Sequence, residues 1–139
     1  MGRARVLVVE DEPDIVNVLN DLLSSAGYDV SSTDSVFGAA ALVRQLDPCV
    51  ILLDLGLPYR PGTTLLAELK ADPRTADVPV LIISGLPEAL TEERRAQATA
   101  VLTKPVDMTV LLDAIQHACE LRSHNGNGKA LTENGKGGQ

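Results

Sequence analysis

The sequence has very few aromatic residues and no tryptophan: Tyr28, Phe37 and Tyr59 are the only ones. Proteins that bind single-stranded nucleic acids usually stack the bases on aromatic side chains, so a base-stacking surface is not expected here. Basic residues are also scarce, because 12 lysines and arginines stand against 19 aspartates and glutamates and leave a net charge of −7. Binding to a phosphate backbone requires clustered positive charge, so this composition predicts no nucleic-acid partner.

Long apolar runs and a secretory leader are missing as well. No stretch approaches the roughly 20 apolar residues that a membrane helix requires, and the amino end lacks the apolar core of a signal peptide. We therefore expect a cytoplasmic protein without membrane contact. Only two cysteines are present, Cys49 and Cys119, and their spacing fits no metal or redox motif. In a reducing compartment they are predicted to be small, buried hydrophobic residues with free thiols.

The sequence does contain a regular alternation of short apolar runs and amphipathic segments. Apolar runs predict five strands, at residues 5–9, 28–32, 50–54, 78–84 and 100–103. Apolar residues at three- and four-residue spacing predict helices near residues 13–26, 35–46 and 107–122, and a helix that begins at Gly62 and carries Leu65, Leu66 and Leu69. A polar helix is expected near residues 87–98. Strands that alternate with helices predict an α/β fold, in which a five-stranded parallel sheet carries helices on both faces.

The end of the chain differs in composition from the rest. From Ser123 to Gln139 the sequence is rich in asparagine and glycine and has almost nothing to bury, which predicts a flexible tail. We therefore expect one folded domain over residues 4–122 and a tail over residues 123–139.

Four of the predicted strands end in a functional group: Glu10 and Asp11, Asp54, Ser84 and Lys104. The carboxyl ends of parallel strands share one edge of the sheet, so these groups are expected to converge there. Neighbouring carboxylates repel one another, and a divalent cation relieves that repulsion; a few carboxylates with retained water suit Mg²⁺ better than Ca²⁺. Asp54 could then act as a nucleophile that forms an aspartyl phosphate, with positive charge and donors around the phosphoryl oxygens. The pattern predicts a site that accepts a phosphoryl group.

These motifs make the sequence resemble a receiver domain of the response regulators of two-component signalling, the CheY-like family. The hallmarks of that family are an acidic pair, a phosphoacceptor aspartate, a serine or threonine, and a lysine–proline pair. The matching segments are Val-Leu-Val-Val-Glu-Asp-Glu at 6–12, Leu-Leu-Asp-Leu-Gly-Leu-Pro at 52–58, Ile-Ile-Ser-Gly at 82–85 and Leu-Thr-Lys-Pro at 102–105. The resemblance covers residues 4–122 and implies a doubly wound, flavodoxin-like fold with strand order 2-1-3-4-5.

Carried over by position, the resemblance implies a role for each residue at the strand ends. Asp54 would be the phosphoacceptor, and Asp11 and Asp54 would bind Mg²⁺ directly. Glu10 would reach the ion through water, and the backbone carbonyl of Gly56 would be the remaining protein ligand.

The resemblance also implies how the phosphoryl group is held and where it comes from. Ser84 and Lys104 would bond the phosphoryl oxygens. The donor would be a phosphohistidine on a histidine kinase or a histidine phosphotransfer protein. The domain would catalyse its own phosphorylation and dephosphorylation without being an enzyme for other substrates. The signal would be passed on through formation of a homodimer or through contact with a downstream protein target.

Two departures from the family pattern leave alternatives open. Family members usually carry an aromatic residue three positions before the lysine, where this sequence has Val101, and the glycine usual just before that strand is absent. A receiver-like docking module without regulated phosphorylation is therefore one alternative. A phosphatase of the haloacid dehalogenase type is a more remote one, because Asp54-Leu55-Gly56 lacks the second acid that such enzymes carry.

Overall fold

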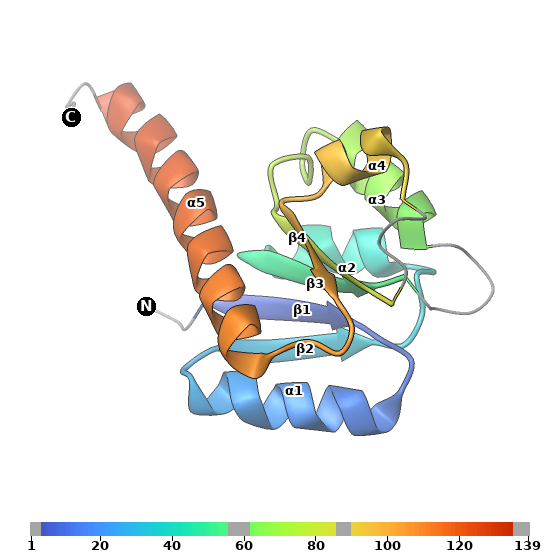
Figure 1. Cartoon of the computed structure of the whole chain (residues 1–139). Helices are drawn as coiled ribbons and strands as arrows, with labels where there is room; N and C mark the ends of the chain where they lie inside the picture. The colour runs from blue at the N-terminus through green and yellow to red at the C-terminus, as the bar shows by residue number, and fades with distance from the viewer. Residues whose placement is uncertain (1–3, 56–61, 86–89, 135–139) are drawn as a thin grey trace.

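Five short strands pair in parallel into one sheet, in the order β2-β1-β3-β4-β5 (Figure 1). The structure is a computed structural model, and it describes residues 4–55, 62–85 and 90–134. The strands are β1 (Arg5–Val9), β2 (Asp29–Thr33), β3 (Val50–Asp54), β4 (Val80–Ser84) and β5 (Ala100–Thr103). The predicted α/β fold and its strand order 2-1-3-4-5 are confirmed.

The central strands are buried on both faces of the sheet. Every residue of β3 and of β4 is buried, which explains why their sequences are continuous apolar runs instead of alternating ones. In the register, Val9 pairs with Leu53 and Asp54 pairs with Ile83. The carboxyl ends of β1, β3 and β4 therefore finish at nearly the same level, and the residues that follow them meet at one edge.

Helices cover both faces of the sheet (Figure 1). The helices are α1 (Pro13–Ser25), α2 (Ala39–Leu46), α3 (Gly62–Ala71), α4 (Glu92–Gln97) and α5 (Met108–Asn134). One core cluster joins α2 and α3 to one face of the sheet, and a second joins α1 and α5 to the other face. The short α4 lies beside α3 and has no buried residue. Burial on both sides explains why β1, β3 and β4 form a rigid base for the edge above them.

Two helices begin later than the sequence predicts. Ser35 does not cap α2; its Oγ accepts a hydrogen bond from the backbone N–H of Phe37 at 3.0 Å. The chain then passes through Gly38, whose φ of 75° is left-handed, and α2 starts only after it. The helix predicted near residues 87–98 begins at Glu92, where Thr91 Oγ1 accepts the N–H of Arg94 at 3.1 Å. Residues 86–89 lie outside the described part of the chain.

The last helix extends past its predicted end near Arg122. It begins where Asp107 Oδ1 accepts the N–H groups of Thr109 at 2.8 Å and Val110 at 3.1 Å, and it continues to Asn134. Lengthening an existing helix needs no new nucleus, so the glycines and asparagines after Arg122 do not end it. Residues 135–139 are not described, and the division of the chain at residue 122 stays a prediction. Over the described ranges, no helix is both long and apolar enough to cross a membrane.

The prediction of two free cysteines is wrong. Cys49, just before β3, and Cys119, on the inner side of α5, form a disulfide with a Cα–Cα distance of 4.7 Å. The two cysteines are separated by 70 positions in the sequence, so no local motif indicates that they pair. The fold brings them together because α5 packs on the face of the sheet where β3 begins.

Candidate functional site

Three carboxylates meet at the carboxyl edge of the sheet. Asp54 is the last residue of β3, and Glu10 directly follows β1. The backbone of Glu10 still belongs to the sheet, since its N–H donates to the carbonyl of Thr33 at 3.0 Å. Both side chains are buried, with only 4% of each residue exposed, whereas Asp11 is partly exposed. Two acids are therefore held inside the protein and a third lies at its surface.

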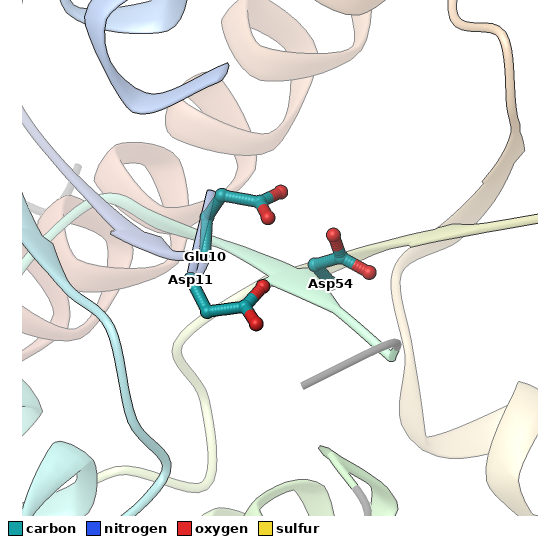
Figure 2. Close-up of side chains that lie close together, drawn as sticks. All are labelled: Glu10, Asp11 and Asp54. Carbon is teal, nitrogen blue, oxygen red and sulfur yellow. The ribbon is translucent and has the colours of Figure 1, made fainter. Parts of the chain in front are cut away.

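The carboxylates face one another closely. One oxygen from each of Glu10, Asp11 and Asp54 lies within 4.8 Å of the other two. Figure 2 shows the side chains of Glu10 and Asp11 extending toward Asp54 from the adjoining end of β1. Glu10 Oε2 also accepts the backbone N–H of Glu12 at 3.2 Å, which fixes its orientation. The predicted convergence of these three acids at the strand ends is what the fold produces.

The proximity of these groups changes the protonation of Glu10. Burial raises the pKa of its carboxyl to about 8, with the hydrogen bond to Asp54 and the negative charge of Asp54 acting in the same direction. The N–H of Glu12 and the charge of Lys104 only partly oppose this rise in the pKa. At neutral pH the Glu10 carboxyl is therefore largely protonated, and its proton can be shared with Asp54 through their hydrogen bond.

Lys104 supplies the positive charge of the site. Its Nζ donates to Asp54 Oδ2 at 2.8 Å, across 50 residues of sequence. Burial lowers the pKa of this ammonium, but the hydrogen bond to Asp54 and the surrounding carboxylate charges outweigh burial and leave the pKa raised. The backbone N–H of Lys104 donates to the carbonyl of Ser84 at 2.9 Å, and the Lys104–Pro105 peptide bond is cis. Lys104 therefore stays charged beside Asp54.

Ser84 and Gly56 complete the predicted set of site residues. Ser84 is the last residue of β4, is 7% exposed, and follows Ile83, the register partner of Asp54. It therefore lies at the same sheet edge as Asp54 and Lys104. Gly56 lies outside the described residues, so its predicted role as a carbonyl ligand stays a prediction.

The donor set of the cluster suits a hard divalent cation. All the candidate ligand atoms are carboxylate oxygens, which are the ligands that hard cations such as Mg²⁺ prefer. The oxygens of Glu10, Asp11 and Asp54 lie within 4.8 Å of one another, close enough for a single ion to lie among them. Asp11, at the surface, leaves room for retained water. These residues could hold a metal ion.

An apolar cavity beside the site was not predicted from the sequence. It has a volume of about 560 Å³ and extends from Glu10 and Lys104 between α1 and the start of α5. Its apolar lining includes Val18 and Met108, which are 55% and 41% exposed. Val18 precedes the buried Leu19 and widens the apolar face of α1 toward solvent. This wider apolar face of α1 is the feature of the sequence from which the cavity could have been predicted.

Comparison with known proteins gives this edge its context. The family model of the response regulator receiver domain matches residues 6–116, which is most of the chain. The chain belongs to the response regulator receiver family. Receiver domains are signalling domains of two-component systems, and the site described above lies where the strands of this receiver end.

Several curated relatives are similar to this chain in sequence. The DNA-binding dual master transcriptional regulator RpaA of Synechocystis is 36% identical over 81% of this chain, which spans 47% of RpaA. Protein PilH of Pseudomonas aeruginosa is 32% identical over 81% of this chain, which spans 94% of PilH. The chain thus spans about half the length of one relative and nearly all of another.

Solved structures show the same fold. A sensor protein from Polaromonas has a TM-score of 0.79 and 28% identity, over 86% of this chain and 98% of its own. The receiver domain of the sensor histidine kinase PA1611 from Pseudomonas aeruginosa has a TM-score of 0.73 and 26% identity, over 86% of this chain and 98% of its own. The latter was solved with a magnesium ion coordinated in its active-site cleft.

The pKa of Glu10 predicts a pH-dependent gain in stability for the variant Glu10→Gln without metal. The folded pKa, about 8, lies above the ordinary value of 4.5, so the wild-type receiver loses stability as pH rises from 4.5 to 8. Glutamine keeps a donor toward Asp54 but does not titrate. We expect the variant to be more stable by about 1–3 kcal/mol at pH 8 and nearly equal to wild type at pH 4.5.

Urea denaturation in a chelator at several pH values would measure this difference. Glu12→Gln is the matched control, because Glu12 is exposed, and it should change stability by less than about 0.5 kcal/mol. A stability difference between Glu10→Gln and wild type that stays constant from pH 4 to 9 would contradict the shared proton.

Proposed function

We propose that this receiver accepts a phosphoryl group on Asp54 from the phosphohistidine of a histidine kinase or a histidine phosphotransfer protein. The observation that carries the proposal is the position of Asp54, a buried carboxylate at a strand end, 2.8 Å from the Lys104 ammonium and beside two further acids. A purely structural domain has no need to bury a carboxylate cluster at this edge, since burial of charge is costly. The resulting signal would pass on through protein–protein contacts.

The chain's own residues account for the chemistry of the transfer. An oxygen of Asp54 would attack the phosphorus atom, the new O–P bond would form, and the P–N bond to the donor imidazole would break. Lys104 would move its hydrogen bond from the carboxylate to a phosphoryl oxygen, and Ser84 would donate its hydroxyl to another. Both act on charge that grows during the transfer. In a later step, water would attack the phosphorus atom of the aspartyl phosphate, break the O–P bond, release inorganic phosphate and restore the Asp54 carboxylate.

Mg²⁺ is the cation that we propose for the carboxylate cluster. Asp11 and Asp54 would bind it directly, Glu10 would reach it through water, and the Gly56 carbonyl would complete the protein ligands. The magnesium ion in the PA1611 receiver supports this choice, as does the all-oxygen donor set of the cluster. When bound, the ion would neutralise charge on the attacking carboxylate and on the phosphoryl oxygens.

The apolar cavity suggests where the phosphodonor docks. It opens beside Lys104, and its rim on α1 and α5 carries the exposed apolar side chains of Val18 and Met108. A helix of the donor placed across this rim would bring a phosphohistidine to the strand-end edge. A protein donor would therefore depend on the rim, whereas a small phosphodonor would not.

A docking module without regulated phosphorylation is the second candidate function. The observation that favours it is Val101, which lies on β5, is half-buried and packs against the core cluster of α2 and α3. A valine there cannot swing between a buried and an exposed position as an aromatic side chain could. This candidate predicts an output surface that does not respond to the state of Asp54.

The cytoplasmic location of the protein also stays a prediction.

The phosphoacceptor proposal is tested by intact mass spectrometry after incubation with Mg²⁺ and acetyl phosphate. We expect one added phosphoryl group on the wild-type chain, removed by hydroxylamine as expected of an acyl phosphate, and none on Asp54→Asn. Asp113→Asn, an exposed acid on α5, is the matched control and should be phosphorylated like wild type. An unmodified wild-type chain whose fold is intact by circular dichroism would favour the docking module.

The docking rim gives a separate prediction for the variant Val18→Asp. A charged side chain at this exposed apolar position should slow transfer from a phosphorylated histidine phosphotransfer protein by about tenfold or more, since a charge would be desolvated in the contact. Phosphorylation by acetyl phosphate should be unchanged. Val110→Asp, an equally exposed valine outside the cavity lining, is the control. Equal slowing with both donors would refute the docking role, because the defect would then lie in the site itself.

A further inference from the structure

The disulfide between Cys49 and Cys119 joins two elements at the end of the sheet remote from the phosphoacceptor. Cys49 precedes the first residue of β3, and Asp54 is the last residue of the same strand. The backbone N–H of Cys49 donates to the carbonyl of Arg5 at 2.8 Å, which fixes Cys49 to the start of β1. Neither sulfur is therefore close to the carboxylate cluster, and the proposed phosphoryl transfer makes no use of the bond.

We propose that this disulfide is a reversible redox switch that clamps the carboxyl-terminal part of α5 to the start of β3. Oxidised, the bond fixes the helix at Cys119; reduced, it leaves the following turns held only by weaker contacts. The redox partner that would reduce or re-form this bond is a small thiol or its disulfide, such as reduced or oxidised glutathione. The switch operates independently of Asp54.

Contacts around Arg122 show what remains when the bond is reduced. Its guanidinium donates to the Asp47 carboxylate and, at 3.5 Å, to the carbonyl of Pro48, and it lies 3.8 Å from Asp77. Asp47 is 74% exposed, so its ion pair is screened by water and contributes little. Among the contacts described for Cys119–Arg122, the covalent bond, one helical turn before Arg122, is thus the strongest attachment.

The packing of α5 allows the bond to open without unfolding the domain. Leu111, Ile115 and Ala118 are almost completely buried against the sheet, so the first half of the helix stays anchored by its apolar face. Cys119 is 9% exposed and adjoins the same apolar cluster, where a free thiol is well tolerated. Reduction therefore releases the helix only beyond Ala118, and Figure 1 shows the last turns of α5 continuing past the sheet.

The exposure of the two sulfur-bearing residues determines the direction of attack. Cys49 is the more accessible, because it is only half-buried. A small thiolate would attack Cys49 Sγ, form a mixed disulfide there, and release Cys119 as a thiolate that takes up a proton. A second thiolate would attack the outer sulfur of the mixed disulfide, release the Cys49 thiolate and leave as the oxidised small disulfide. Two electrons and two protons pass to the protein, and oxidised glutathione reverses both steps.

The test equilibrates the full chain in mixtures of reduced and oxidised glutathione, followed by acid quenching, alkylation of free thiols and intact mass. We expect both forms to be populated across the series and to interconvert reversibly. Hydrogen exchange of the two forms should then differ locally: residues beyond Ala118 should exchange about tenfold faster when reduced, with β1 unchanged. Cys49→Ala/Cys119→Ala should behave like the reduced form in every buffer.

Three results would overturn the switch. One is a disulfide that stays intact in excess reduced glutathione, as a permanently structural bond would. Another is faster exchange throughout the domain on reduction, in β1 as well as α5, and the third is exchange of α5 that does not depend on the bond. Phosphorylation by acetyl phosphate should proceed equally in both redox forms, so a failure of the switch is distinguishable from a failure of the phosphoacceptor site.

Discussion

The repulsion between carboxylates at one edge of the sheet is the constraint on which the rest of the structure depends. Glu10 and Asp54 are buried side by side, and a burial that would be prohibitive for two free charges is offset by a shared proton and by the Lys104 ammonium at 2.8 Å. Both of these stabilising contacts, the proton between the acids and the pairing of Lys104 with Asp54, can be exchanged for others. A divalent cation can take the place of the proton, and a phosphoryl group can take the place of the carboxylate as the partner of Lys104. The same electrostatic problem therefore explains both the resting structure and the proposed chemistry.

The apolar layers keep these groups close despite their repulsion. Because β3 and β4 are buried on both faces, neither strand can shift along its neighbour without moving a whole row of core side chains. The register that pairs Asp54 with Ile83 therefore holds the acid beside the strand that ends in Ser84. At the other end of β3, the disulfide of Cys49 connects the same strand to α5. One strand thus carries the proposed phosphoacceptor at its carboxyl end and is preceded by a disulfide-bonded cysteine at its amino end.

Much of this arrangement could be predicted from the sequence because it depends on local patterns. Apolar runs that end on Asp54 and before Lys104 indicate strands whose ends meet, and parallel topology alone then brings distant residues together. The remainder depends on tertiary distances. Nothing near Cys49 indicates that α5 will place a second cysteine beside it, and the late start of α2 follows from the left-handed backbone at Gly38. The cavity beside Val18 likewise exists only once two helices are packed.

The most direct test of the central claim is a Mg²⁺ titration of the metal-free chain, followed through the backbone amide resonances in ¹H–¹⁵N spectra. The claim predicts saturable shifts concentrated at Asp11, Asp54 and their neighbours, at least about tenfold weaker affinity in Asp11→Asn, and no such loss in Asp113→Asn. Shifts spread evenly over acidic surface residues, or binding unaffected by Asp11→Asn, would contradict the claim that the strand-end carboxylates form a cation site.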